Sequence, residues 1–277
     1  MIALELARRG MNIITIARDP RRAVDLQEQV LRTTGRAAVE VIAGDLSTRT
    51  GITTAASTIA ARVDAIQVLV NNAGAHFPEH RLTADGVEMH VAVDYLAAHG
   101  LTTLLEPQLR RGRARVVNVA SDTLRDTRQI KFLGRPRPAT LDIDDLADLA
   151  RLNPRPGFVP FEAYARAKLL TVIAGYDLAR SFAGEVTVNA VHPGIVATDI
   201  IDDLVPRPLR ALAPLIRRSL LTPEAGAAAA LRLATDAALE GVTGRYFVQK
   251  TGTTTPAITY RHDVQQRLRE ASDRFFS

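Results

Sequence analysis

The feature that most constrains the fold is a regular alternation of short apolar runs with amphipathic stretches. Apolar runs at residues 11–17, 37–43, 66–70, 115–120 and 186–191 predict buried strands, and helical patterns at 2–9, 20–34 and 48–63 separate the first of them. Strands that are apolar throughout and joined by helices predict a parallel sheet covered on both faces. We therefore predict a doubly wound α/β fold, with residues 1–277 in a single domain.

Polar residues follow the predicted strands directly. Arg18, Asp45, Asn72 and Ser121 each come at or just after a strand end. The carboxyl ends of parallel strands share one edge of the sheet, and ligands bind beyond that edge. We expect these four side chains to lie along a ligand-binding edge.

Tyr164 and Lys168 form the clearest catalytic pattern. Phe161, Ala165 and Leu169 recur at helical spacing around them, so the tyrosine and lysine project from one helical face. A cation beside a phenol stabilises phenolate and pulls its pKa towards the range that a general acid or base needs. Only three of the 35 lysines and arginines are lysines, which favours chemistry that arginine cannot do. The alternative is a half-buried tyrosine beside a solvated lysine.

Composition excludes several other classes. The net charge of +5 is scattered, without a basic stripe and interleaved aromatic residues, so we expect no nucleic-acid partner. The chain has no cysteine, which excludes thiolate metal sites and favours a reducing, cytoplasmic setting. No apolar run approaches the ~20 residues of a membrane span. Arginine-rich, lysine-poor usage suggests a bacterial, GC-rich genome. His76 and His80 straddle Pro78, so we expect no metal site there.

Four motifs occur in the order of the short-chain dehydrogenase/reductase family, which the chain resembles over nearly its whole length. They are Asn71, Asn72, Ala73 and Gly74 after a strand, Ser121 after another, Tyr164 with Lys168, and His192, Pro193 and Gly194. Residues 83–88, 116–121, 186–194 and 244–247 most resemble its retinol-dehydrogenase-like and WW-domain-oxidoreductase-like branch. The resemblance implies a Rossmann-like fold.

The resemblance also implies roles for individual residues. Tyr164 would be the general acid in carbonyl reduction, Lys168 would lower its pKa and hold the nicotinamide ribose, and Ser121 would bind the substrate oxygen. Asn72, Asp45 and Leu46 would line the adenosine half of the cofactor, and Val196 and Thr198 the nicotinamide half. The alternatives are a charge at a helix N-terminus beside Ser47 for Asp45, and a strand-end turn for Ser121.

Arg18 decides the expected cofactor. In the family, sites for a ribose 2′-phosphate place an arginine after the second strand, whereas sites for a 2′-hydroxyl place an acid there. The strand at 11–17 corresponds to that second strand, because the first strand of the family is missing here. Arg18, with Arg21 and Arg22 close behind, favours NADP(H) over NAD(H). Asp19 is the competing observation, because an acid one position later could reach a hydroxyl.

The sequence departs from the family pattern in two places. The family opens with a strand and a glycine-rich turn, whereas a helical pattern begins here at Met1. We expect an N-terminal truncation or an internal start codon, which would leave two neighbouring strands with unpaired backbone groups. Asp94 stands where the family has an asparagine that orders a catalytic water. Its carboxylate would pair with Lys168 and oppose the effect of that cation on Tyr164.

The substrate side is expected in residues 122–160, with a short acidic helix near 142–150, and in a lid at 200–222. Both segments supply apolar side chains, consistent with a small hydrophobic carbonyl or alcohol substrate. An apolar stripe at 261–276 predicts a helix docked on the domain or on a second subunit of a homo-oligomer. We therefore predict an NADP(H)-dependent oxidoreductase. The alternative is a degenerate dinucleotide-binding or scaffold protein of the same fold.

Overall fold

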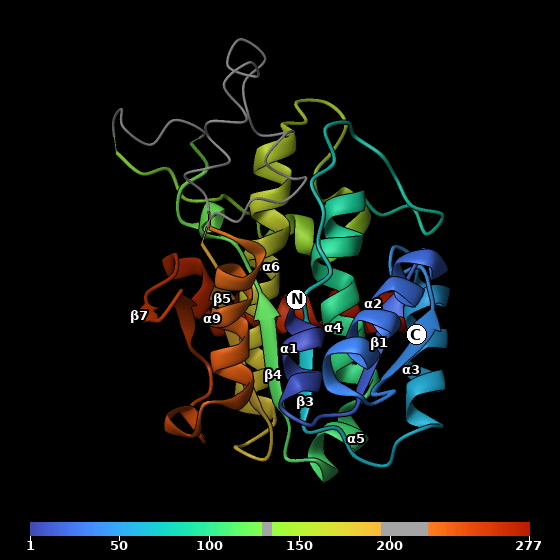
Figure 1. The fold of residues 1–277 in the computed structure, drawn as a ribbon. Helices are drawn as coiled ribbons and strands as arrows, with labels where there is room; N and C mark the ends of the chain where they lie inside the picture. Colours follow the sequence, from blue (N-terminus) through green and yellow to red (C-terminus); the bar gives the residue numbers. More distant parts are fainter. Residues whose placement is uncertain (129–134, 195–220) are drawn as a thin grey trace, which may run out of the picture.

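The computed structural model describes residues 1–128, 135–194 and 221–277 (Figure 1). Val196, Thr198 and nearly all of the expected lid at 200–222 lie outside these ranges. The strands are β1 (Ile13–Ala17), β2 (Val39–Ala43), β3 (Val68–Asn71), β4 (Arg115–Val119), β5 (Thr187–His192), β6 (Tyr246–Val248) and β7 (Thr251–Thr253). The main helices are α1 (Ile2–Arg8), α2 (Pro20–Thr34), α3 (Arg49–Ala60), α4 (Ala97–Leu104), α5 (Glu106–Arg111), α6 (Pro160–Ser181), α9 (Pro223–Thr235) and α10 (His262–Phe276).

The elements begin and end where local chemistry allows. The Asp19 carboxylate caps α2 by accepting a hydrogen bond from the Arg21 N–H, and Gly35 ends that helix in the left-handed region at φ +67°. The Thr48 hydroxyl caps α3 by accepting from the Gly51 N–H at 3.1 Å. The predicted strands and helices are confirmed, with boundaries that differ by a few residues.

The strands form two sheets. β1 and β2 pair in parallel, with Ile13 opposite Val39. β3, β4, β5 and β6 pair in parallel in that order, and β7 returns antiparallel to β6 as a polar hairpin strand that the sequence patterns did not predict. The mainly parallel α/β architecture is as predicted.

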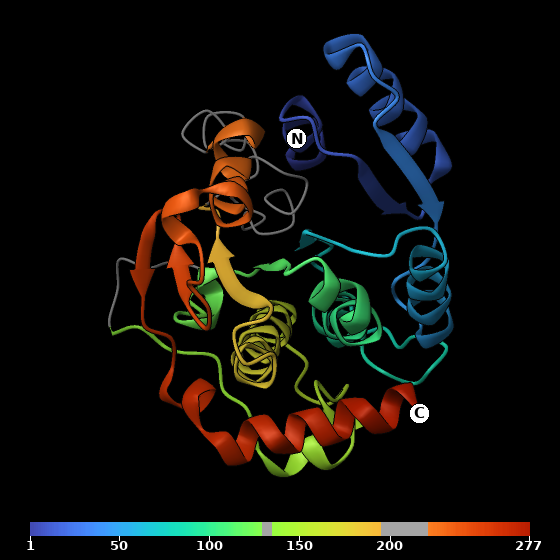
Figure 2. The same cartoon turned by 90° about the horizontal axis from the view of Figure 1, so that it is seen from below.

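The boundary between the sheets lies at β1 and β3 (Figure 2). Among the residues described, each of these strands pairs along one edge only. All five residues of β1 and the first three of β3 are half-buried, whereas most of β4 and β5 is fully buried. Side chains from β1 and β3 still share an apolar cluster with α1 and α9, including Leu6 and Ile13.

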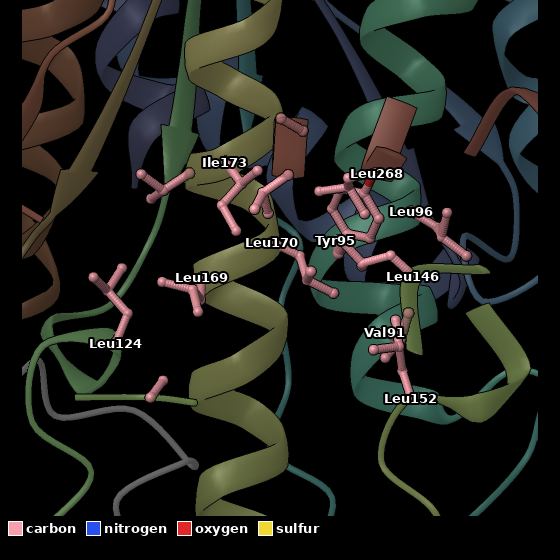
Figure 3. Close-up of a cluster of buried hydrophobic side chains, with 14 of the residues drawn as sticks. Val91, Tyr95, Leu96, Leu124, Leu146, Leu152, Leu169, Leu170, Ile173 and Leu268 are labelled. Carbon is pink, nitrogen blue, oxygen red and sulfur yellow. The ribbon is translucent and has the colours of Figure 1, made fainter. Parts of the chain in front are cut away.

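Helices cover both faces of the strands. In Figure 2, α1 and α9 lie on one side and α3, α4 and α6 on the other. The second side holds the larger core, where Tyr95, Leu169, Ile173 and Leu268 meet (Figure 3). The centre of that core is α6, whose residues from Phe161 to Ala179 are almost all buried.

The C-terminal helix α10 packs against α6, with Val264, Leu268 and Ala271 buried. The prediction that this helix docks on the domain is confirmed. Instead of one short helix near 142–150, two 3₁₀ turns, η3 (Asp144–Ala147) and η4 (Leu149–Arg151), pack beside α10. Within the described ranges, none of the helices combines the length and apolar character needed to cross a bilayer.

Candidate active site

Ser121 lies two residues beyond β4, at the carboxyl end of the sheet, and is buried. Its side chain caps the 3₁₀ turn η2 (Asp122–Leu124) by accepting from the Thr123 N–H at 3.4 Å. The Ser121 side chain also interacts with the Tyr164 phenol and lowers its pKa. The serine therefore forms a strand-end turn and at the same time faces the candidate catalytic tyrosine.

Tyr164 and Lys168 lie one turn apart on α6 and face the end of β4. Their side chains are buried, with exposed fractions of 9% and 3% for the two residues. The Lys168 Nζ lies 5.6 Å from the centre of the Tyr164 ring. Helical spacing thus brings the phenol and the ammonium together, and the end of β4 adds the Ser121 hydroxyl.

Two contacts hold the Lys168 ammonium in the interior. It donates to the Val119 carbonyl at 3.2 Å, and its Nζ lies 3.1 Å from Asp94 Oδ1. Burial alone would lower the pKa of Lys168, but attraction to the Asp94 carboxylate and to the Tyr164 oxygen raises it above the ordinary value. Lys168 therefore stays protonated.

The pKa of Tyr164 differs from the sequence-based expectation. Burial raises it, Lys168 lowers it, the Asp94 charge raises it, and the hydrogen bond with Ser121 lowers it. The net shift is upward, because loss of water around the phenolate outweighs the attraction of one cation that is shared with a carboxylate. Lys168 acts in the expected direction but does not bring the pKa below its ordinary value.

Asp94 lies on η1 (Val91–Leu96), a π-helical turn, a distortion that is frequent at functional sites. Its Oδ1 accepts from the Ala75 N–H at 3.1 Å as well as contacting Lys168. A Cβ on Gly74 would lie 2.7 Å from Asp94 Oδ1 and 2.9 Å from Lys168 Nζ. Only glycine therefore lets the loop after β3 pass so close to this ion pair.

The expected cofactor residues also lie at the carboxyl ends of strands. Arg18 follows β1 and Asn72 follows β3, and both are exposed. Asp45 follows β2 and accepts from the Ser47 N–H at 3.0 Å, while its neighbour Leu46 is half-buried. The structure therefore places Arg18, Asp45 and Asn72 where a ligand can reach them, at the same end of the strands as Ser121.

Two buried residues near Tyr164 were not singled out from the sequence as site residues. Glu88 and His90 are fully buried, and Glu88 contacts Asn153, 65 positions later in the chain. The available signal was a carboxylate and an imidazole two residues apart, directly before an apolar helical stretch. The sequence does not show which residues such a pair contacts, so no role could be assigned to it.

A pocket of about 880 Å³ lies elsewhere, between residues 140–145, residues 153–159 and α10. Its α6 wall is formed by Glu162, Ala163 and Arg166. At 100° per residue, Arg166 points away from the helical face that carries Tyr164. On α6 this pocket therefore lies on the side away from Tyr164, although Asn153 and Phe158 of its lining also contact Glu88 and His90.

Comparison with known proteins agrees with this geometry. The sequence model for short chain dehydrogenase matches residues 1–129. Polyprenol dehydrogenase of Homo sapiens is 32% identical over 280 residues, covering 96% of this chain and 78% of that protein. Retinol dehydrogenase 12 of Bos taurus is 32% identical over 249 residues, covering 88% and 72%.

Solved structures share the fold. A crystal structure of an uncharacterised protein from Mycobacterium paratuberculosis superposes with a TM-score of 0.71 at 23% identity, covering 99% of this chain and 87% of that one. An NADPH-dependent reductase involved in bacilysin biosynthesis gives a TM-score of 0.66 at 18% identity, covering 92% and 93%. At 32% identity over more than two thirds of their length, the polyprenol and retinol dehydrogenases show that the chain belongs to the short-chain dehydrogenase/reductase family, in its retinol-dehydrogenase-like branch.

Proposed function

We propose that the protein is an NADP(H)-dependent oxidoreductase that interconverts an apolar carbonyl compound and its alcohol. The observation that carries the proposal is the buried group of Ser121, Tyr164 and Lys168 where β4 meets α6. The donor set fits a nicotinamide dinucleotide, because cationic and amide side chains lie along the strand ends and Gly74 keeps the loop after β3 close to Lys168. The bound cofactor supplies or accepts the hydride.

Each side chain has a role that follows from its place. In reduction, the Tyr164 hydroxyl gives its proton to the substrate oxygen as negative charge develops there. Ser121, which is buried beside Tyr164, donates to the same oxygen and stabilises that charge. Lys168 stabilises the phenolate that Tyr164 becomes. In alcohol oxidation the phenolate takes the proton back.

The proposed substrate class is a small apolar alcohol or aldehyde. Two relatives are named for polyprenol and retinol, which are both apolar alcohols. Leu124 is fully buried just beyond Ser121, and Phe158 packs against His90, whose ring borders Tyr164. Apolar surroundings of this kind exclude water from the reacting oxygen and favour substrates with little polar surface.

Arg18 supports NADP(H) as the cofactor. It is exposed at the end of β1 and can meet a 2′-phosphate. Asp19, the competing acid, is engaged locally, since its Oδ1 accepts from both the N–H and the Nε of Arg21 at 3.0 and 3.3 Å. A capping carboxylate of this kind is less able to serve a ribose hydroxyl.

An Arg18→Ala variant tests the cofactor assignment. Because a charge-assisted contact contributes ~1.5–3 kcal/mol, NADPH affinity should fall roughly ten- to a hundredfold while NADH affinity hardly changes. Titration of nicotinamide fluorescence measures both dissociation constants. Arg32→Ala, an exposed arginine at the far end of α2, is the control. Equal losses for NADPH and NADH would contradict the assignment.

A second candidate is a dinucleotide-binding protein with little turnover. It is favoured by the Asp94–Lys168 ion pair, which draws the cation away from Tyr164, and by the raised pKa of Tyr164. The two candidates separate in one assay of NADPH binding and NADPH consumption with a series of apolar aldehydes. Binding without consumption would support the second candidate.

A further inference from the structure

Glu88 and His90 form a buried pair that the mechanism above does not use. Both residues are completely buried. Placing an ionisable pair in the interior costs several kcal/mol unless hydrogen bonds satisfy it. This pair is satisfied, because the Glu88 Oε1 accepts from the His90 N–H at 3.1 Å and lies 2.9 Å from His90 Nδ1. The Glu88 Oε2 accepts from Asn153 Nδ2 at 2.8 Å.

These contacts determine the state of the imidazole. Burial raises the pKa of Glu88, but the hydrogen bonds from His90 and from Asn153 bring it below the ordinary value. Glu88 is therefore a carboxylate, and His90 Nδ1 carries the proton that it accepts. The other nitrogen, Nε2, accepts a hydrogen bond from the Phe77 N–H at 3.0 Å. One carboxylate thus orients the imidazole so that its acceptor nitrogen faces the loop after β3.

That loop passes directly over the candidate active site. Its backbone is held at two points, the Ala75 N–H by Asp94 and the Phe77 N–H by His90. Between β3 and these two points, Asn72, Ala73 and Gly74 are exposed. Because Gly74 lies against the Asp94–Lys168 ion pair, a shift of the loop would open the space beside Lys168.

The His90 ring also borders the tyrosine. Its centre lies 6.1 Å from the centre of the Tyr164 ring, at an interplanar angle of 69°. The Phe77 and Phe158 rings pack on the same imidazole, with centres 5.1 and 6.2 Å away. Because both of its nitrogens are held, the His90 ring is fixed in place and restricts movement of the Tyr164 ring beside it.

We propose that Glu88 and His90 are positioning residues for the reaction at Tyr164. Glu88 fixes the orientation and tautomer of His90, and His90 fixes both the loop after β3 and the ring of Tyr164. This inference rests on the proposed function, since it assigns the pair to the proton transfer that Tyr164 performs. Neither residue is expected to exchange protons with the substrate.

The test compares His90→Leu with His90→Gln. Leucine fills the site but removes the acceptor of the Phe77 N–H and the imidazole that faces Glu88 Oε1. The turnover number should therefore fall roughly ten- to a hundredfold. The NADPH dissociation constant should rise much less than the turnover number falls, because Arg18 and Lys168 are untouched and only the loop that carries Asn72 is released. Glutamine retains an acceptor for the Phe77 N–H and should restore most of the lost turnover.

His99→Leu is the matched control. His99 is a second buried histidine, on α4, and its ring nitrogens have no hydrogen-bond partner among the described residues. If burial of a histidine alone mattered, both leucine variants would lose turnover; we expect the loss only at position 90. Hydrogen exchange at the Phe77 amide adds a readout that is independent of activity and should accelerate in His90→Leu but not in His99→Leu.

Tyr164→Phe, measured in parallel, shows whether a negative result contradicts the proposed function or only the positioning role of Glu88 and His90. Normal turnover in Tyr164→Phe would overturn the proposed function and this inference with it. Loss of turnover in Tyr164→Phe together with normal turnover in His90→Leu would overturn the positioning role alone. A fall in turnover that glutamine does not restore, with equal loss of NADPH affinity, would show that His90 only supports the fold and would also overturn it.

Discussion

β1 is more apolar than β5 but is less buried. β1 carries three isoleucines in five positions, yet every residue in it is half-buried. β5 contains Asn189 and Thr187 among its valines, yet all but its last residue are fully buried. The difference is the number of neighbours, since β5 lies between β4 and β6 whereas β1 pairs along one edge only among the described residues. Burial of a strand is thus set by its partners rather than by its own composition.

This contrast separates the two halves of the proposed active site. The proton-transfer group of Ser121, Tyr164 and Lys168 belongs to the densely packed region around β4, β5 and α6. The residues proposed to select the cofactor, Arg18 and Asp45, follow the two-stranded sheet. We therefore expect the chemistry to depend on rigid packing and the cofactor preference to depend on exposed charges.

The largest expected effect is on stability. Ile173 on α6 is completely buried, whereas Ile14 on β1 is only half-buried. Ile173→Ala should lower the free energy of unfolding by ~2–5 kcal/mol through lost burial and the cavity left behind. Ile14→Ala should cost markedly less. Urea unfolding measures the free energy of unfolding of both variants. Equal losses in the two would contradict the statement that α6 lies in a more densely packed region than β1.

A pH-dependent effect comes next. Burial lowers the pKa of His99 to about 4, whereas an unfolded histidine titrates near ~6.5. Between these values the unfolded chain binds more protons than the folded one, so stability falls as the pH drops through that window, by up to ~3 kcal/mol. His99→Leu should remove this part of the acid sensitivity.

Urea unfolding of His99→Leu and wild type at several pH values between about 7 and about 4 gives the comparison. The exposed His262 offers a control, and His262→Gln should keep the wild-type pH dependence. An unchanged slope in His99→Leu would mean that the packed region does not extend to α4 as described.

The smallest effect concerns the ion pair within the packed region. The Asp94 charge raises the pKa of Tyr164, so Asp94→Asn should lower that pKa and raise the rate of alcohol oxidation at neutral pH roughly two- to tenfold. The asparagine oxygen can still accept from the Ala75 N–H. Asp94→Ala cannot, and it should show no gain. A rate–pH profile of Asp94→Asn that coincides with that of the wild type would contradict this account.

Local patterns predicted what depends on local geometry. Helical spacing placed Tyr164 beside Lys168, and the strand end placed Ser121 at the carboxyl edge of the sheet. The grouping of Ser121 with Tyr164 and the pairing of Asp94 with Lys168 were predicted from the resemblance to the family. The net rise in the Tyr164 pKa was not predictable, because it depends on how much water the fold removes. The contact between Glu88 and Asn153 could not be predicted from the sequence either, because it joins segments 65 positions apart that only the tertiary fold brings together.

The β6–β7 hairpin could not be predicted from local sequence patterns either. β7 consists of Thr251, Gly252 and Thr253, which have no apolar pattern, and its pairing depends on β6 already lying beside β5. Val196 and Thr198, outside the described residues, remain predictions, as does the lid at 200–222.

Single-turnover oxidation of NADPH with an apolar aldehyde tests the central claim most directly. Tyr164→Phe removes one oxygen and should lower the rate ~10²–10⁴-fold, the contribution of a general acid, with NADPH affinity unchanged. Tyr176→Phe removes the same atom from a buried tyrosine on the same helix, where the hydroxyl bonds Thr255 at 3.1 Å, and should retain the wild-type rate. A Tyr164→Phe variant that turns over like wild type would contradict the proton-transfer role of Tyr164.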